Sequence, residues 1–370
     1  MFNPEFEIIL ITSICAAACA LPGVFLVLRK VALMSDAISH AILLGIVLAF
    51  FITKDLSSPL LVVAAALTGI LTVSLTEAII QTQKLKKDAA IGLVFPLLFS
   101  IGVILINRNA GDVHLDADCV LFGEVAFLPF DRLVVHNIDF GPKGLWIVLG
   151  TFLLNAFFIV LFYKELKIAT FDVGLAASLG FLPGLVNYLL MTIVSITAVS
   201  SFQIVGSILV VALMITPPAS AYLLTNRLSH MIFISVFLGI ASSVGGYFMA
   251  YRLDASIAGS MASFSGILFF LTLIFAPEKG LLAKFIVKKF KKWNFASETL
   301  AVHLLQAEYA HAEDAERVVS HMNDHMLWGN DFTSEVIAQS LEEGLIKKSG
   351  NKLSLTALGR EKAKNIISKN

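Results

Sequence analysis

Charged residues are scarce in this sequence. Only 15% of the 370 residues are Asp, Glu, Lys or Arg, whereas 57% are hydrophobic and 29 are Phe. Soluble domains average about 25% charged residues. The three cysteines, Cys15, Cys19 and Cys119, form no CxxC motif and no disulfide framework. The composition therefore excludes a soluble or disulfide-stabilised protein and indicates a chain that lies mostly in membrane lipid.

A phosphate-binding loop of the GxxxxGK[ST] type is also missing. Such loops hold the phosphates of ATP with backbone N–H groups and a lysine. We therefore expect a chain that does not hydrolyse ATP itself. We also expect that it is not an enzyme and binds no organic cofactor.

Apolar runs long enough to cross a bilayer recur through residues 1–276. A transmembrane helix needs about 17–25 mostly apolar residues. The runs lie near residues 6–28, 37–53, 59–80, 90–106, 145–163, 184–201, 203–224, 231–251 and 257–276. A helix break at Pro22-Gly23 would reduce the count to eight. The sequence thus predicts an all-α polytopic membrane domain over residues 1–280, with eight or nine transmembrane helices.

Basic residues are distributed unevenly between the two sides that alternating spans define. One side carries eight, namely Arg29, Lys30, Lys84, Lys86, Lys87, Lys164, Lys167 and Arg227. It also receives the cluster after the last span: Lys284, Lys288, Lys289, Lys291 and Lys292. The other side has five in much longer loops. Because cytoplasmic loops are enriched in Lys and Arg, we expect an extracytoplasmic N-terminus and a cytoplasmic C-terminal tail.

One short stretch, residues 34–41, places Asp36 four residues before His40. On a helix both side chains leave the same face, about 5–6 Å apart at Cβ. Ionisable residues at membrane depth are costly and mark functional sites by default, so we favour a divalent-cation site; an alternative is that the two side chains only satisfy each other inside a helix bundle. A site deep in the membrane would require residues 29–36 to dip inward, as broken helices do in transporters.

Residues 107–143 form the longest stretch between spans. They carry six acids, Asp112, Asp116, Asp118, Glu124, Asp131 and Asp139, against three bases. A negative vestibule of this kind would concentrate cations, and an ordinary solvated loop is an equal alternative. Within the spans, Glu77, Asn155 and Ser195 are expected to join helices rather than bind ligands.

A second segment of interest connects two spans on the cytoplasmic side. Asp172 can cap a short helix, Ala176 and Ala177 favour it, and Gly180 with Pro183 end it. A short surface helix with small residues can fill a groove of a partner. The alternative is a plain linker helix at the membrane interface.

The tail differs in composition from the rest. Residues 281–293 are a basic juxtamembrane linker, and residues 294–370 read as helix, hairpin and helix, an order that suits a small winged-helix-like α+β domain. This domain has eleven acids and eight bases, which argues against DNA binding. His321 and His325 have metal-ligand spacing, so a regulatory metal site is a possible reading beside two solvated histidines.

Several motifs resemble the permease subunits of ABC importers for manganese, zinc or iron. They are residues 35–41 (SDAISHA), 88–95 (DAAIGLVF), 121–124 (LFGE), 205–219 (VGSILVVALMITPPA) and 251–254 (YRLD). The likeness covers residues 5–280, while the tail resembles, more weakly, the winged-helix part of diphtheria-toxin-repressor-like regulators. The resemblance implies a bacterial cytoplasmic-membrane permease that passes Mn²⁺, Zn²⁺ or Fe²⁺ through Asp36 and His40, with manganese preferred.

The resemblance also implies partners. ATP would bind a separate ATPase subunit that docks on the segment Thr170–Gly180, and its expected contacts are Thr170, Phe171, Asp172, Leu175, Ala176, Ala177, Leu179 and Gly180. An extracytoplasmic metal-binding protein would deliver the ion, and a second permease chain, identical or paralogous, would complete the path. Two other functions stay open at this point: a stand-alone secondary metal transporter, and a membrane-tethered metal-responsive regulator.

Overall fold

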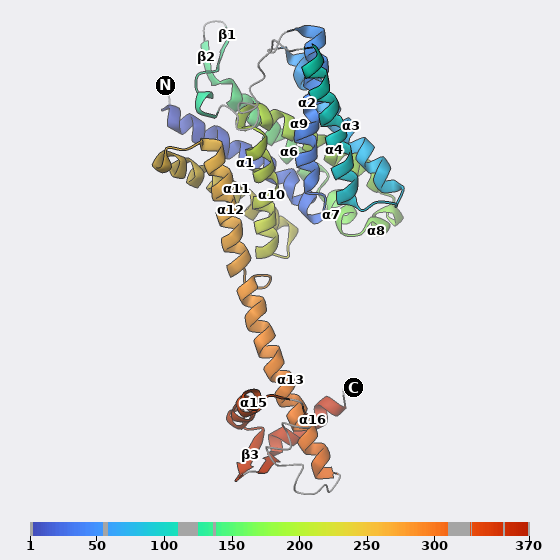
Figure 1. Ribbon diagram of the computed structural model, residues 1–370, viewed down its shortest axis with the longest axis vertical. Coiled ribbons are helices and arrows are strands. Elements are labelled where there is room, and N and C mark those ends of the chain that lie inside the picture. Colours follow the sequence, from blue (N-terminus) through green and yellow to red (C-terminus); the bar gives the residue numbers. More distant parts are fainter. Residues whose placement is uncertain are drawn as a thin grey trace. The chain divides into compact units, whose positions relative to one another are not determined.

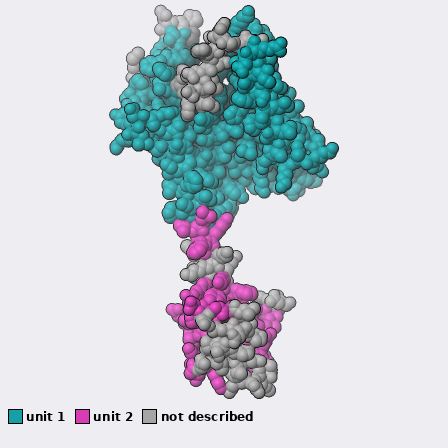
Figure 2. Space-filling model, viewed as in Figure 1, with its two compact units in different colours: residues 1–280 teal, residues 281–370 magenta. Residues whose placement is uncertain are grey.

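The computed structural model describes residues 3–54, 58–109, 125–135, 138–309, 326, 328–350 and 352–368. The chain divides into two compact units, Met1–Gly280 and Leu281–Asn370, which Figure 2 colours separately. Within the described residues, nine helices are long and apolar enough to cross a membrane. These are α1 (Pro4–Leu28), α2 (Leu33–Thr53), α3 (Pro59–Gln81), α4 (Lys87–Asn109), α6 (Lys143–Leu161), α9 (Pro183–Val205), α10 (Ser207–Leu224), α11 (Leu228–Leu253) and α12 (Ile257–Phe275). The nine predicted spans are confirmed, with ends shifted by a few residues.

The break expected at Pro22-Gly23 is wrong, because α1 continues through both residues. A proline inside a transmembrane helix is tolerated where neighbouring helices pack closely. Gly23 provides that packing: a Cβ at this position would collide with the carbonyl oxygen of Met214 in α10. The glycine therefore serves close helix approach, and the chain turns later, at residues 29–32.

Helix α1 forms the centre of the first unit (Figure 1). It contacts α6, α9, α10 and α11, while α2 packs against α3 and α4, and α12 packs against α10 and α11. Cys15 and Cys19 are buried in this core, as expected for small apolar residues. Asn155 of α6 is also buried; it donates from Nδ2 to the Ala18 carbonyl at 2.8 Å and to Thr197 Oγ1 at 2.9 Å. Its predicted role in joining helices is confirmed.

Shorter elements lie at the two ends of α1. At its start is a hairpin of β1 (Arg132–Val135) and β2 (Ile138–Pro142), preceded by the 3₁₀ turn η1 (Val125–Phe127). Beyond its end are α7 (Tyr163–Phe171) and α8 (Val173–Ser178). Figure 1 shows the hairpin and α7–α8 at opposite ends of this unit. The two connections that the sequence assigned to opposite sides of the membrane are thus separated by the length of α1.

The second unit has its own small core. Its elements are α13 (Leu281–Tyr309), α15 (Asn330–Glu342), β3 (Ile346–Ser349), β4 (Lys352–Leu355) and α16 (Ala357–Ile367). Leu300 and Leu304 of α13 pack with Val336 of α15 and with Leu353 and Leu355 of the antiparallel hairpin. Residues 281–293, expected as a linker, form the first half of α13. The helix–hairpin–helix order is present, and the winged-helix assignment stays a prediction.

Candidate functional site

The predicted pair lies on the first two turns of α2. Asp36 is in the first turn and His40 follows one turn later, so both project from one face. The imidazole Nε2 is 3.3 Å from Asp36 Oδ1. The Asp36 side chain retains 37% of its exposure, and the His40 side chain retains 35%. Neither is sealed inside the unit, so both are open to a further ligand.

The geometry of this pair suits a shared cation. Carboxylate oxygens and imidazole nitrogens bind zinc at about 2.0–2.2 Å. Two such donors at an angle of about 90–110° around the ion would be about 3.0–3.5 Å apart. The observed 3.3 Å separation falls in that range. Among the described residues, however, no group of three or more His, Cys, Asp or Glu could hold a metal, so a complete metal site at Asp36 and His40 would need further donors.

Two aromatic rings of α4 flank the imidazole. The ring of Phe95 is stacked on that of His40 with centroids 5.9 Å apart, and Phe99 meets it edge-on at the same distance. These contacts limit rotation of the imidazole, and they place an apolar wall beside the two donors. An apolar surrounding strengthens the attraction between a carboxylate and a cation.

The chain is partly buried where it enters α2. Val31 in the preceding turn and Met34 and Ser35 of α2 are buried, whereas Lys30 is exposed. Arg29, which the charge map treated as a cytoplasmic surface residue, is held by hydrogen bonds to Thr170 and Asn187. Burial lowers the pKa of this guanidinium to about 10, and the negative charge of Glu77 opposes the shift. This arrangement could not be predicted from sequence patterns, because its members come from four separate helices.

The predicted coupling segment forms two helices rather than one. Thr170 and Phe171 end α7, and Asp172 caps α8 by accepting a hydrogen bond from the Leu175 backbone N–H at 2.9 Å. Gly180 ends the segment at a φ of +84°, a conformation that favours glycine. Ala176 is fully buried against the unit, whereas Ala177 is exposed. Only the second alanine can contact a partner.

Exposed apolar side chains extend along this segment and beyond Gly180 into the start of α9. They are Phe171, Val173, Leu175, Leu179, Leu182 and Leu185. Six such residues over one connection form a surface that a partner protein can cover.

Two groups of sequence candidates lie outside the described residues. The possible regulatory ligands His321 and His325 are among them. So are Asp112, Asp116, Asp118 and Glu124 of the predicted acidic vestibule, of which only Asp131 and Asp139 are described. Both interpretations stay predictions.

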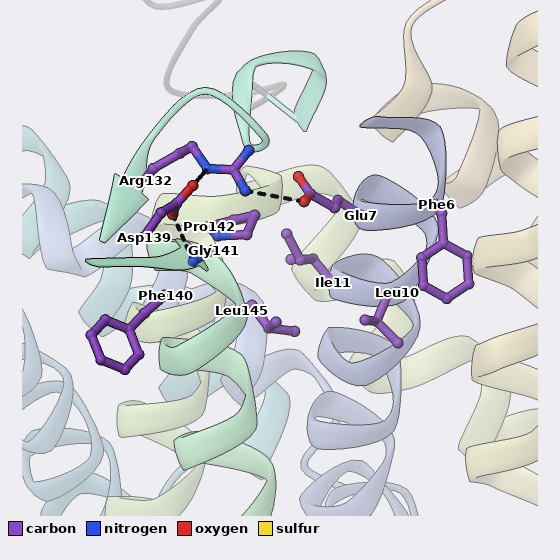
Figure 3. A pocket seen from close by; sticks show the side chains of 10 residues that line it. All are labelled: Phe6, Glu7, Leu10, Ile11, Arg132, Asp139, Phe140, Gly141, Pro142 and Leu145. Carbon is purple, nitrogen blue, oxygen red and sulfur yellow. Dashed lines mark hydrogen bonds and ion pairs between the residues drawn. The ribbon is translucent and has the colours of Figure 1, made fainter. Parts of the chain in front are cut away.

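A cavity of about 360 Å³ opens where α1 begins, between this helix and the hairpin (Figure 3). Its wall is mainly apolar, with Phe6, Leu10 and Leu145 among the lining residues. Arg132 of β1 bridges two carboxylates at its edge: Nε is 2.6 Å from Asp139, and Nη2 is 3.5 Å from Glu7. The bridge ties the hairpin to the start of α1.

Replacing Arg132 by Met should destabilise this end of the protein. The Glu7 side chain keeps only 7% of its exposure and Arg132 27%, so the variant leaves a buried carboxylate without its cation. We expect a loss of about 2 kcal/mol in thermal unfolding of the purified protein. Adding Glu7→Gln should recover part of that loss, because an amide needs no counter-charge. Equal stability of the single variant and the wild type would contradict this interpretation.

Comparisons with known proteins agree with this architecture. The zinc transport system membrane protein TroD of Treponema pallidum is 44% identical over 354 residues, which cover 95% of this chain and 96% of TroD. The manganese transport system membrane protein MntD of Bacillus subtilis is 43% identical and covers 76% of this chain and 94% of its own. An alignment that covers 95% of this chain must include most of residues 281–370, so the similarity to TroD extends into the second unit.

A solved structure shows the same fold. PsaBC from Streptococcus pneumoniae in complex with Fab contains a chain that aligns with 75% of this one and 94% of its own, at a TM-score of 0.62 and 30% identity. Residues 2–276 match the family described as the ABC 3 transport family. This match spans all nine membrane helices of the described residues. The chain belongs to the ABC 3 transport family.

Proposed function

We propose that the chain is the permease subunit of an ATP-driven importer for a divalent transition metal, manganese or zinc, which passes between Asp36 and His40 and their counterparts in a second permease chain. The observation that carries the proposal is the 3.3 Å pair on α2. A carboxylate offsets the charge of the ion, and a neutral imidazole adds a borderline ligand. Relatives named for zinc and manganese transport support this substrate class.

The proposal includes a second permease chain because two donors do not complete a coordination sphere. Structural and catalytic zinc sites use at least three protein ligands. Two facing copies would bring two carboxylates and two imidazoles to one path. The 35–37% exposure of both side chains leaves room for such a facing surface. This donor set does not by itself favour manganese over zinc, because the Irving–Williams order ranks zinc higher at most N/O sites.

Energy would enter through α7 and α8. The chain has no nucleotide-binding loop, so a separate ATPase subunit must supply it. The exposed side chains of the segment, including Phe171, Leu175 and Leu179, offer an apolar docking surface. Delivery of the ion from an extracytoplasmic binding protein would take place at the other end of α1, near the hairpin.

Reconstitution of the permease with its ATPase in liposomes tests the proposal. We expect uptake of ⁵⁴Mn²⁺ or ⁶⁵Zn²⁺ that requires ATP, and competition between the two ions will identify the preferred substrate. Uptake that proceeds without ATP would instead favour a stand-alone secondary transporter. The absence of uptake for both ions, in a complex that hydrolyses ATP, would remove the proposed substrate class.

A further inference from the structure

A polar network joins the coupling segment to the turn before α2, the helix that carries Asp36 and His40. Arg29 Nε donates a hydrogen bond to Thr170 Oγ1 at 3.1 Å, and Arg29 Nη1 donates to Asn187 Oδ1 at 2.8 Å. Asn187 Nδ2 then donates to Glu77 Oε2 at 3.4 Å. One guanidinium therefore connects the end of α1 with α7 and, through the amide, with α9 and α3.

Arg29 lies between the end of α1 and the start of α2, the helix that carries Asp36. It is the residue that ends α1, and Lys30, at a φ of +57°, turns the chain toward α2. Asp36 follows seven residues after Arg29, with Val31 and Met34 buried between them. A displacement of the guanidinium can therefore act on the first turn of α2 through this short, partly buried connection.

The guanidinium has few other attachments. Its remaining nitrogen, Nη2, is buried and has no hydrogen-bond partner among the described residues. The bonds through Nε and Nη1 thus fix its orientation. Thr170 lies at the end of α7, directly before the proposed docking helix, so its hydroxyl group is a direct polar link between that segment and Arg29.

We propose that Arg29 is a positioning residue that transmits movement of the α7–α8 segment to the Asp36–His40 pair. The inference rests on the proposed function, in which an ATPase docks on that segment. Arg29 contacts the docking segment at Thr170, and its hydrogen bonds among the described residues include neither the metal donors nor the exposed apolar side chains of that segment. It acts through the Thr170 hydroxyl on one side and the 29–32 turn on the other. Glu77 balances its charge across the Asn187 amide.

Two conservative variants test the link in the reconstituted complex. Thr170→Val deletes the acceptor while preserving side-chain shape, and Arg29→Lys keeps the charge but not the fork of two directed donors. For each we expect ATP-driven metal uptake at saturating ion to fall about tenfold while ATP hydrolysis continues. The affinity for the metal should not change. Metal uptake by the double variant should be no lower than uptake by Arg29→Lys alone, because both substitutions break the same Arg29–Thr170 hydrogen bond. Lys84→Gln, at an exposed cation outside the 29–32 turn, is the control for loss of a basic side chain and should match the wild type.

The outcomes separate this inference from the proposed function. If both variants keep the wild-type ratio of ions moved to ATP hydrolysed, while Asp36→Asn is inactive, the inference is overturned and the metal site stands. If Asp36→Asn transports normally, the proposed site fails whatever Arg29 does. A fall in metal affinity equal to the fall in uptake would place Arg29 in ion binding and overturn a positioning role. If Arg29→Lys fails to assemble, Thr170→Val decides, since it removes one hydroxyl group.

Discussion

Asp36→Asn and His40→Ala should each abolish metal uptake by the reconstituted complex, with a loss of at least about a hundredfold. Changing even the outer-shell partners of metal ligands lowers metal affinity or activity about 10–100-fold, and these variants remove the proposed direct donors. The asparagine keeps the shape of the side chain but loses the charge that offsets a dication. The alanine removes the nitrogen and leaves Phe95 and Phe99 facing a space that has no donor. Uptake of ⁵⁴Mn²⁺ or ⁶⁵Zn²⁺ into liposomes provides the measurement.

Matched controls separate the site from general effects of substitution. Asp254→Asn lies at the end of α11, at a left-handed residue where asparagine is well tolerated, and His230→Ala changes an exposed histidine near the start of α11. Both should transport as the wild type does. Co-purification with the ATPase and basal ATP hydrolysis should persist in the Asp36 and His40 variants, because α7 and α8 are unchanged. Normal uptake in either site variant would remove the metal-site assignment.

The membrane helices and the spacing of the metal pair could be predicted because both depend on local patterns. Hydropathy over about 20 residues defines a span, and a separation of four residues places Asp36 and His40 on one helix face. The helix break at Pro22-Gly23 was predicted wrongly, because the sequence does not show how closely α10 approaches Gly23, and this tertiary contact accommodates the proline. In the proposed function, the donors that complete the site come from a second chain, which no single sequence displays.

The hydrogen-bond network around Arg29 could not be predicted from the sequence, for a different reason. Hydropathy and charge rules treat each cation near a span as a surface anchor, so Arg29 and Lys30 counted alike. The structure separates them: Arg29 is hydrogen-bonded inside the unit, whereas Lys30 is exposed. The partners of Arg29 are far apart in the chain: Glu77, Thr170 and Asn187. Only the packing of α1, α3, α7 and α9 brings them together.

The two alanines of α8 were predicted as one docking surface, and their burial divides them. Ala176 packs in the same core cluster as Leu166, Val186 and Leu190, so it belongs to the permease itself. Ala177 faces outward beside exposed apolar residues such as Leu175. Helical periodicity could have separated the two positions, but the inward face was not known until α8 was placed against α9.

Ala177→Glu should therefore uncouple the permease from its ATPase without unfolding it. A carboxylate in an apolar interface loses its hydration without gaining a partner, which costs several kcal/mol. We expect loss of ATPase co-purification and of ATP-driven uptake, with the free energy of unfolding of the isolated permease unchanged within about 0.5 kcal/mol. Ala176→Leu should do the reverse: it overpacks the core and lowers stability by about 1–3 kcal/mol.

The two variants should show opposite patterns of ATPase co-purification and stability, because Ala177 is assigned to a docking surface and Ala176 to the core. Ala255→Glu, at an exposed residue after α11, is the matched control for adding a charge away from α8, and it should leave co-purification intact. If Ala177→Glu retains the ATPase and wild-type uptake, the docking surface lies elsewhere on the permease. In that case Arg29 would also lose its proposed input, since the movement it transmits begins at α8.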